Sequence, residues 1–410
     1  MSLPHLPFDP SCCLIGGEWQ NSASLEKLEL INPSDGSILT EIASGNENDI
    51  DAAITSAQYA FEQCWSTTPA AERGRILSNL GRLILKNIDL LSTLEAIDVG
   101  KPFTQAQADV RALARYMEFY GGAADKVHGE TIPYLEGYTV YTLREPHGVT
   151  GHIVPWNYPM QIIGRSVGAA LAMGNSCVLK PAEEACLTAL TFANLALEAG
   201  LPAGVLNVVP GLGATAGAAL CANKGINHIS FTGSVATGRL VQAAAAYNIV
   251  PVTLELGGKS PQLFFEDANL ENALPFLVNA GIQNGGQTCS ASSRILVHRS
   301  RYDEVIDRMS QKYQELVVRP AIDDGALGPL ISERQKLIVE DFISKGQNLN
   351  LVAQGEIDSN VPENGHYVAP HLFANVSDDH ILAKDEIFGP VQVIMAFDTE
   401  EEAINIANGT

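Results

Sequence analysis

The stretch VTGHIVPWNYPMQIIGRSVGAALAMGNSCVLKPAE, residues 149–183, joins two apolar runs through a segment rich in alanine and glycine. The runs at 150–154 and 177–179 predict buried strands, and the segment at 160–173 predicts the helix between them. The same alternation continues to residue 256, with further apolar runs at 205–208, 229–231 and 252–254 and helical segments at 185–199, 214–222 and 235–247. Strands that alternate with helices through short turns predict a parallel sheet covered by helices on both faces.

Residues suited to ligand binding follow the ends of these predicted strands. They are Trp156 and Asn157, then Lys180 and Glu183, then Gly211, then Gly233 and Ser234, and finally Glu255. Ligands of open α/β sheets bind beyond the carboxyl ends of the strands, so these residues predict a binding site.

Three of these positions suit a dinucleotide. The glycine turn at 211–217 departs from the common G-x-G-x-x-G spacing and also fits a plain turn. Gly233 and Ser234 before a helix indicate a pyrophosphate at the helix N-terminus, although Ser234 also fits an ordinary helix cap. Glu183 could accept hydrogen bonds from a ribose diol and would repel a 2′-phosphate, which favours NAD over NADP. Alternatively, Glu183 is a solvated carboxylate at a helix start.

Cys289 lies in the stretch NGGQTCSASS, residues 284–293, whose composition is typical of a loop. A nucleophilic thiol needs an exposed setting and a base. Glu255, which ends an apolar run upstream, is a candidate for that base. The alternative is that Cys289 is a small buried hydrophobic residue.

A second strand and helix pattern follows residue 258 and predicts a second α/β domain that carries Cys289. Its first strands are expected at 262–265 and 294–298, and its first helices at 270–284 and 302–317. Alternating residues at 128–148 predict an extended hairpin arm, or equally an ordinary edge hairpin.

The composition excludes several classes of protein. The chain has 410 residues, is 46% hydrophobic and carries a formal net charge of −22, so we expect neither nucleic acid nor an anionic membrane as a partner. No apolar run approaches the roughly 18 residues of a membrane span, and residues 1–9 lack the pattern of a secretory signal. Seven scattered cysteines indicate free thiols in a reducing, cytoplasmic compartment, and no His or Cys spacing predicts a metal site.

Six motifs in this order resemble the aldehyde dehydrogenase superfamily, from about Leu14 to the last residue. They are PWNYP at 155–159, KPAE at 180–183, FTGS at 231–234, ELGGK at 255–259, GQTC at 286–289 and EIFGP at 386–390. The resemblance is strongest to the NAD-dependent branch that oxidises betaine aldehyde and amino- or carboxy-aldehydes.

The resemblance implies an α/β fold of the aldehyde dehydrogenase type with three parts. They are a Rossmann-type parallel-sheet domain for NAD at 1–127 and 149–257, a β-hairpin oligomerisation arm at 128–148 and a second α/β catalytic domain at 258–410. The arm would join copies of the chain into a dimer or tetramer.

The chemistry implied by the resemblance is NAD-dependent oxidation of an aldehyde to a carboxylic acid. Cys289 would attack the aldehyde carbon to give a thiohemiacetal, and loss of hydride to nicotinamide would leave a thioester. Glu255 would be the general base that activates Cys289 or the hydrolytic water. The Asn157 amide and the Cys289 backbone N–H would form the oxyanion hole.

The resemblance also implies the cofactor contacts. Lys180 and Glu183 would contact the adenine ribose, and Glu386 the nicotinamide ribose, with Phe388 packing nearby. The remaining residues of the cofactor cleft would be Trp156, Gly211, Gly233, Ser234 and Leu256.

Two features set the chain apart from the family. Arg165, expected at the substrate site with Tyr158, occupies a position where many relatives carry tryptophan or another apolar residue. Some semialdehyde-oxidising relatives carry arginine there, so Arg165 predicts a substrate with a distal carboxylate; the alternative partner is a protein carboxylate. Relatives run past residue 410, so we expect C-terminal truncation. The alternative functions are a nucleotide-binding relative with impaired catalysis and a thiol esterase that uses Cys289.

Overall fold

The computed structural model describes residues 3–410, which divide into two compact units. The first comprises the residues up to Leu30, Ile38–Leu94 and Ala106–Glu255, and the second comprises Ile31–Ser37, Glu95–Gln105 and Leu256–Thr410. The segments 31–37 and 95–105, which the sequence analysis grouped with the cofactor domain, thus cluster with the second unit.

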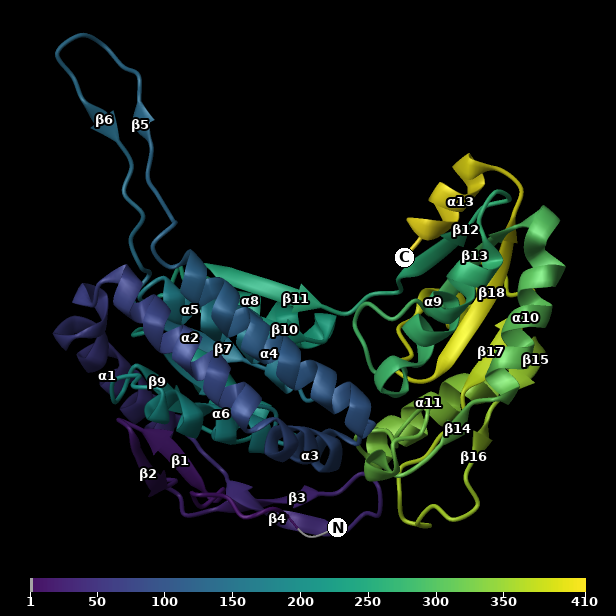
Figure 1. Cartoon of the computed structure of the whole chain (residues 1–410), viewed down its shortest axis with the longest axis horizontal. Coiled ribbons are helices and arrows are strands. Elements are labelled where there is room, and N and C mark those ends of the chain that lie inside the picture. Colours follow the sequence, from purple (N-terminus) through teal and green to yellow (C-terminus); the bar gives the residue numbers. More distant parts are fainter. Residues whose placement is uncertain (1–2) are drawn as a thin grey trace. The chain divides into compact units, whose positions relative to one another are not determined.

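A seven-stranded sheet organises the first unit (Figure 1). Its strand order is β11 (Val252–Leu256), β10 (His228–Gly233), β7 (Val149–Ile153), β8 (Ser176–Lys180), β9 (Leu206–Val208), β1 (Cys12–Ile15) and β2 (Glu18–Asn21). β7 pairs in parallel with β10 and β8, and β8 pairs in parallel with β9. The predicted α/β class with a parallel sheet is therefore confirmed. β1 adds an antiparallel edge, since it pairs antiparallel with both β9 and β2.

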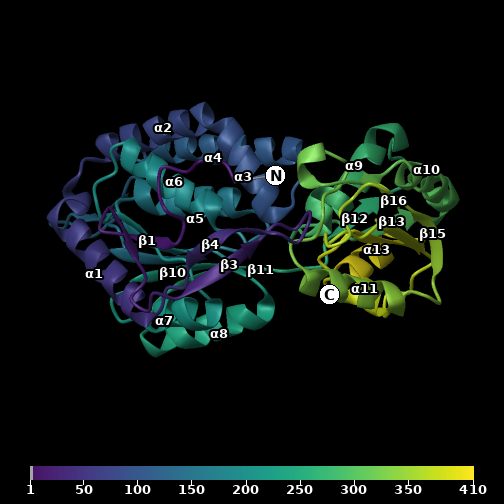
Figure 2. The same ribbon diagram turned by 90° about the horizontal axis from the view of Figure 1, so that it is seen from below.

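Helices cover both faces of this sheet (Figure 2). On one side, α2 (Ala70–Lys86), α5 (Pro159–Ala172) and α6 (Leu187–Glu198) pack against one another, and on the other α7 (Ala218–Ala222) packs with α8 (Val235–Tyr247). The other helices of this part of the chain are α1 (Glu47–Gln63), α3 (Ile88–Val99) and α4 (Phe103–Ala123). α6 is apolar and buried nearly all round, which is why it packs inside the helical layer.

The helix predicted at 214–222 is divided in the structure. Gly213–Gly217 form a π-helical turn, and α7 begins only at Ala218. Gly211 before this turn lies so close to Gly45 that a β-carbon on Gly211 would be 2.6 Å from the Gly45 carbonyl oxygen. Only glycine permits that approach of the two backbones.

The predicted hairpin arm is present as β5 (Thr131–Ile132) and β6 (Val140–Tyr141), which pair antiparallel. Figure 1 shows the hairpin extending away from the rest of the first unit. It exposes six large apolar or aromatic side chains: Ile132, Tyr134, Leu135, Tyr138, Tyr141 and Leu143. Exposed apolar surface of this extent is typical of a binding surface.

A five-stranded sheet organises the second unit. Its order is β12 (Pro261–Phe264), β13 (Arg294–His298), β18 (Val391–Phe397), β17 (His371–Ala374) and β15 (Asn350–Gln354), with only β15 antiparallel to its neighbour. A short ribbon in this unit pairs β14 (Val317–Val318) with β16 (Glu356–Ile357). A second ribbon, almost all of it in the first unit, pairs β3 (Lys27–Ile31) with β4 (Ile38–Ala43).

Successive side chains of the second sheet enter two different cores, as expected for the period of a strand. Ile295 and Val297 of β13 pack in the core that contains α9 (Leu270–Ile282) and α10 (Tyr302–Gln314). Leu296, between them, packs in the opposite core, with residues of the helices α11 (Glu333–Lys345), α12 (Ile381–Lys384) and α13 (Glu400–Ala407).

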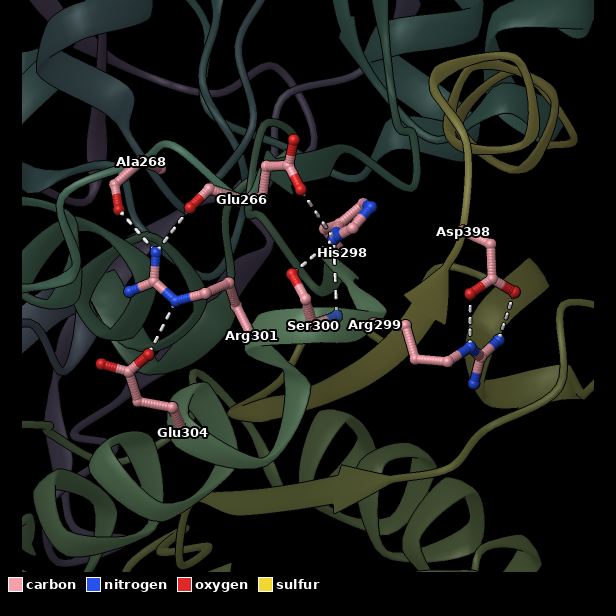
Figure 3. A network of polar contacts seen from close by, with 8 residues as sticks. All are labelled: Glu266, Ala268, His298, Arg299, Ser300, Arg301, Glu304 and Asp398. Atoms are coloured by element: carbon pink, nitrogen blue, oxygen red, sulfur yellow. Dashed lines mark hydrogen bonds and ion pairs between the residues drawn. The ribbon is translucent and has the colours of Figure 1, made fainter.

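A polar network occupies the carboxyl ends of β12, β13 and β18 (Figure 3). Arg301 donates from Nη1 to the Glu266 carbonyl oxygen at 2.8 Å and from Nε to Glu304 at 2.7 Å. Arg299 forms a bidentate pair with Asp398 at 2.5 and 2.9 Å. These groups join the segments that follow the three strands.

Candidate active site

The turn between β7 and α5 buries two of the predicted residues. Asn157 is 6% exposed and Tyr158 is 8% exposed, and Trp156 beside them is half-buried. Pro159 is the first residue of α5. Proline suits that position because its φ is fixed and because the first helical residue has no use for an N–H. Helix initiation therefore holds the Asn157 amide at the carboxyl end of β7.

Lys180 and Glu183 form an ion pair after β8, with 2.7 Å between Nζ and Oε2. Glu183 also accepts a hydrogen bond from the Gly213 backbone N–H at 3.4 Å. Burial opposes the ionisation of Glu183, but the Lys180 charge and the hydrogen bonds prevail and lower the pKa of Glu183. An ionised carboxylate whose side chain is 29% exposed suits a ribose diol and repels a phosphate.

Ser234 caps α8, because its Oγ accepts a hydrogen bond from the Thr237 backbone N–H at 3.2 Å. The interpretation of Ser234 as a helix cap is therefore confirmed. The cap engages one of the four N–H groups that a helix start leaves free, so it is compatible with an anion at the same helix end. Gly233, the last residue of β10, precedes the cap directly.

Glu255 and Arg165 line one cavity of the first unit, with a volume of about 750 Å³. Both residues are exposed. Arg165 forms no ion pair with any carboxylate in residues 3–410. It differs in this from Arg299, Arg301 and Arg308, which each have a carboxylate partner. The guanidinium of Arg165 is therefore available to a ligand.

Three consecutive left-handed residues shape the loop that leads to Cys289. Asn284, Gly285 and Gly286 have φ values of +53°, +64° and +73°. The helix predicted at 270–284 ends two residues early for this reason, as α9 stops at Ile282. Left-handed backbone is rare for a residue with a side chain, and it commonly marks a functional loop.

The side chain of Gln287 holds this loop in place by hydrogen bonds within the second unit. Its fully buried side chain donates from Nε2 to the Asn284 carbonyl oxygen at 3.0 Å and accepts from the Ile331 N–H at 3.0 Å. Cys289, two residues later, remains partly exposed with a free thiol. The loop thus holds Cys289 in one place while leaving the residue partly exposed.

Three loops that precede strands of the second sheet pack together around Cys289. A β-carbon on Gly286 would be 2.1 Å from the Gly389 carbonyl oxygen, and one on Gly258 would be 3.8 Å from the Cys289 carbonyl oxygen. The Gly258 N–H donates to Glu386 Oε1 at 3.3 Å. The structure therefore brings Cys289 and Glu386 together, at the amino ends of β12, β13 and β18.

The loop at 386–390 is itself constrained. Phe388 has a left-handed φ of +56°, and its carbonyl oxygen accepts from Gln335 Nε2 at 3.0 Å. Partial desolvation raises the pKa of the Glu386 carboxyl, against the Gly258 N–H and the Lys259 charge, which act to lower it. Leu256 ends β11, directly before the glycines that contact Glu386.

Gln287, Lys259 and Arg294 belong to this region, but the sequence analysis did not select them. Lys259 is 5% exposed and Arg294 is 2% exposed. Lys259 and Gln287 lie within the ELGGK and GQTC motifs, which marked the region without giving either residue a role. For Lys259 and Arg294 a second signal is a cation next to, or inside, a segment expected to be a buried strand. Such cations are rarely buried without a partner or a function.

No cluster of His, Cys, Asp or Glu able to hold a metal occurs among the described residues. All seven cysteines are free thiols. Within residues 3–410, no helix is long and apolar enough to cross a membrane.

Comparisons with known proteins agree with this arrangement. The model of the "Aldehyde dehydrogenase family" matches residues 19–410. The cytosolic aldehyde dehydrogenase 1 of Rattus norvegicus is 40% identical over 100% of this chain and 82% of its own length. A Burkholderia cenocepacia structure assigned to the aldehyde dehydrogenases has 55% identity and a TM-score of 0.97, over 97% of this chain and 85% of that one. The NAD⁺ complex of a Bacillus cereus aldehyde dehydrogenase has 38% identity and a TM-score of 0.95, over 100% and 85%.

Proposed function

The chain belongs to the aldehyde dehydrogenase family, and from this membership we propose a mechanism in which Cys289 is the nucleophile, Glu255 the general base and Asn157 part of the oxyanion hole. NAD-dependent oxidation of an aldehyde by a catalytic cysteine is the activity of the family. A thiol esterase is not favoured, because it would have no use for the Lys180–Glu183 pair or for Glu386.

In the proposed reaction Cys289 first acts as the nucleophile and then as the leaving group. Its thiolate adds to the aldehyde carbon, and the oxygen of the resulting thiohemiacetal accepts hydrogen bonds from the Asn157 amide and the Cys289 backbone N–H. NAD supplies the hydride acceptor, and hydride loss leaves a thioester on Cys289. Glu255 removes a proton from water, the hydroxide attacks the thioester carbon, and the carboxylic acid departs as the thiolate is restored.

The cofactor contacts are part of the same proposal. Glu183, ionised and partly exposed, would accept the hydroxyls of the adenine ribose, while Lys180 holds it in place. Glu386, with Phe388 beside it, would accept the hydroxyls of the nicotinamide ribose. The remaining residues of the proposed cleft are Trp156, Gly211, Gly233, Ser234 and Leu256.

The observation that carries this function is the Cys289 loop. It is fixed by its left-handed residues and by buried Gln287, while Cys289 itself is a partly exposed free thiol. The test is NADH formation from an aldehyde by wild type, Cys289→Ala and Cys64→Ala. Cys64 is the matched control, since it is also a half-buried free thiol. Turnover should vanish only in Cys289→Ala; equal turnover in both variants would reject the assignment.

We propose further that the substrate is a semialdehyde, an aldehyde with a carboxylate at its far end. Arg165 supports this, because it lines the cavity that holds Glu255 and has no carboxylate partner among the described residues. A guanidinium binds a carboxylate through two parallel hydrogen bonds. A cationic substrate such as betaine aldehyde would be repelled by the same group. Tyr158, buried beside Asn157, would line the substrate site.

The substrate proposal is tested by comparing kcat/KM for succinic semialdehyde with that for a neutral aldehyde of similar length. Arg165→Met should lower the ratio of the two values by roughly 10- to 100-fold, as expected for a lost charged hydrogen bond. Arg165→Lys, which keeps the charge, should lose less. An unchanged ratio in Arg165→Met would contradict the proposal.

The hairpin at 128–148 is proposed as the surface that joins copies of the chain, on the support of its exposed aromatic and aliphatic residues. A cytoplasmic location is proposed from the seven free cysteines.

A further inference from the structure

Two cations are buried side by side where the second sheet begins. Lys259 lies just before β12 and Arg294 is the first residue of β13, and both are more than nine-tenths buried. Removing a charge from water is unfavourable unless hydrogen bonds or an opposite charge compensate for it. Arg294 and Lys259 differ in the hydrogen bonds and opposite charges that compensate for their burial.

Arg294 is fully engaged with backbone oxygens. Its Nε donates to the Lys259 carbonyl oxygen at 2.9 Å, Nη1 to Ile406 at 2.8 Å and Nη2 to Ala407 at 2.8 Å. Arg294 therefore connects the start of β12 with the end of α13. These contacts explain why it is buried without requiring any role in chemistry.

Lys259, in contrast, donates no hydrogen bond from Nζ to any group in the described part of the chain. It also forms no ion pair with a carboxylate of residues 3–410. A buried, unsatisfied ammonium is rare in a folded protein and calls for an explanation. Packing alone supplies none, because an apolar side chain of the same length would fill the space without the desolvation of a charge.

The charged groups that face Lys259 come from two elements. Arg294 of β13 carries a like charge, while Glu386 and Asp385 of the loop before β18 carry opposite ones. Glu386 accepts from the N–H of Gly258, the residue next to Lys259. Burial and the like charge of Arg294 lower the pKa of Lys259 from its ordinary 10.5 to about 7, although the two carboxylates act to raise it. Its charge thus changes near neutral pH, beside the residue assigned to the nicotinamide ribose.

We propose that Lys259 is a positioning residue that adjusts the charge around Glu386 and thereby sets the preference of the enzyme between NAD and NADH. The nicotinamide ring of NAD is cationic and that of NADH is neutral. A protonated Lys259 would repel the first and tolerate the second, whereas a neutral Lys259 would leave the Glu386 carboxylate free to favour NAD. The inference rests on the proposed contact of Glu386 with the cofactor.

The test measures the dissociation constants of NAD and NADH separately, without aldehyde, from about pH 6 to about pH 9. In wild type, the ratio of Kd for NADH to Kd for NAD should rise roughly three- to tenfold as the pH passes about 7. Lys259→Met should give a ratio that stays at the high-pH value. Lys259→Arg, permanently charged, should stay at the low-pH value. If the ratio in Lys259→Met changes with pH in the same way as in wild type, the inference is overturned.

Glu386→Gln separates failure of this inference from failure of the proposed function. If Glu386→Gln leaves both dissociation constants unchanged, the cofactor role of Glu386 is wrong. If Glu386→Gln weakens binding while Lys259→Met keeps the wild-type pH profile, only the role of Lys259 is wrong. If Lys259→Met folds poorly, the ratio of Kd for NADH to Kd for NAD is compared between wild type and Lys259→Arg instead. A wild-type ratio that does not change near pH 7 rejects the inference.

Discussion

The Gly286 α-carbon faces the backbone of Gly389 so closely that a β-carbon would lie 2.1 Å from the Gly389 carbonyl oxygen. The contact joins the loop of Cys289 to the loop of Glu386 without any side chain between them. Gly286 also has a left-handed φ of +73°. Glycine is required there both by conformation and by space.

Gly286→Ala is therefore expected to displace the Cys289 loop and abolish most turnover, with a local strain of about 2–4 kcal/mol. Gly137→Ala is the matched control, because Gly137 has a φ of +86° but no described atom within 4 Å of an added β-carbon. The test measures turnover and the thermal unfolding temperature of both variants. Full activity in Gly286→Ala would show that the two loops can separate without loss of function.

Glu183→Gln is expected to lower the selectivity for NAD over NADP. The neutral amide no longer repels a 2′-phosphate, and it leaves the buried Lys180 ammonium without its counter-charge. The ratio of kcat/KM for NAD to that for NADP should fall roughly tenfold or more. A ratio equal to that of wild type would remove Glu183 from the ribose site.

A double-mutant cycle with Lys180→Met measures the coupling in the ion pair itself. The pKa of Glu183 is lowered in the folded protein, so the pair contributes fully above the ordinary carboxyl pKa, and the contribution is lost as the pH falls through the lowered one. The coupling energy should therefore be larger at neutral pH than in acid. A coupling that does not change with pH would argue against an ionised Glu183.

Lys259→Met is expected to stabilise the protein at neutral pH. The pKa of Lys259 is about 7 in the folded state against an ordinary 10.5, so the unfolded chain binds more protons between these values. The free energy of unfolding of wild type should then rise with pH from about 7 to 10.5, and Lys259→Met should lack this rise. At or below pH 7 the variant should be more stable, by an amount of the order of a few kcal/mol.

Denaturant midpoints at neutral and alkaline pH test this expectation. Lys224→Met, at an exposed lysine, serves as the control and should shift stability by no more than about 0.5 kcal/mol at either pH. If wild type and Lys259→Met change in parallel with pH, Lys259 does not titrate in the range proposed.

If the hairpin arm joins copies of the chain as proposed, substitution of Tyr141 and Leu143 by serine is expected to reduce the mass of the assembly in solution. These side chains are 62% and 70% exposed, so their removal should leave the fold of a single copy intact. Light scattering after gel filtration measures the mass, and far-UV circular dichroism the fold. Tyr59→Ser, at a residue 68% exposed on α1, is the control. An unchanged mass in the double variant would exclude the arm as the joining surface.

Five strands of the first sheet, β7 to β11, could be predicted from the sequence because each coincides with a short local run of apolar residues. The antiparallel β1 could not, since its place beside β9 depends on residues nearly two hundred positions away. The predicted helix at 270–284 extended too far, because helical periodicity does not reveal the left-handed backbone of Asn284. The following pair of glycines was the signal that could have ended it.

Some residues of the candidate site could also be predicted from local sequence, and others could not. Loop composition singled out Cys289, and strand ends singled out Glu255 and Glu183, but Glu386 was selected only through resemblance to a family. The setting of Lys259 could not be predicted, because it depends on the pairing of β12 with β13, and because the carboxylates that act on its charge lie far along the chain. Such contacts leave no local pattern in the sequence.

The two ends of the second sheet offer different opportunities to the protein engineer. The loops around Cys289 precede β12, β13 and β18, whereas the network of Arg299 and Asp398 follows them (Figure 3). Glu266 and Asp398 are well exposed at that following end. A fluorescent label, or a tether to a sensor surface, attached there would hold the enzyme by the strand ends opposite Cys289.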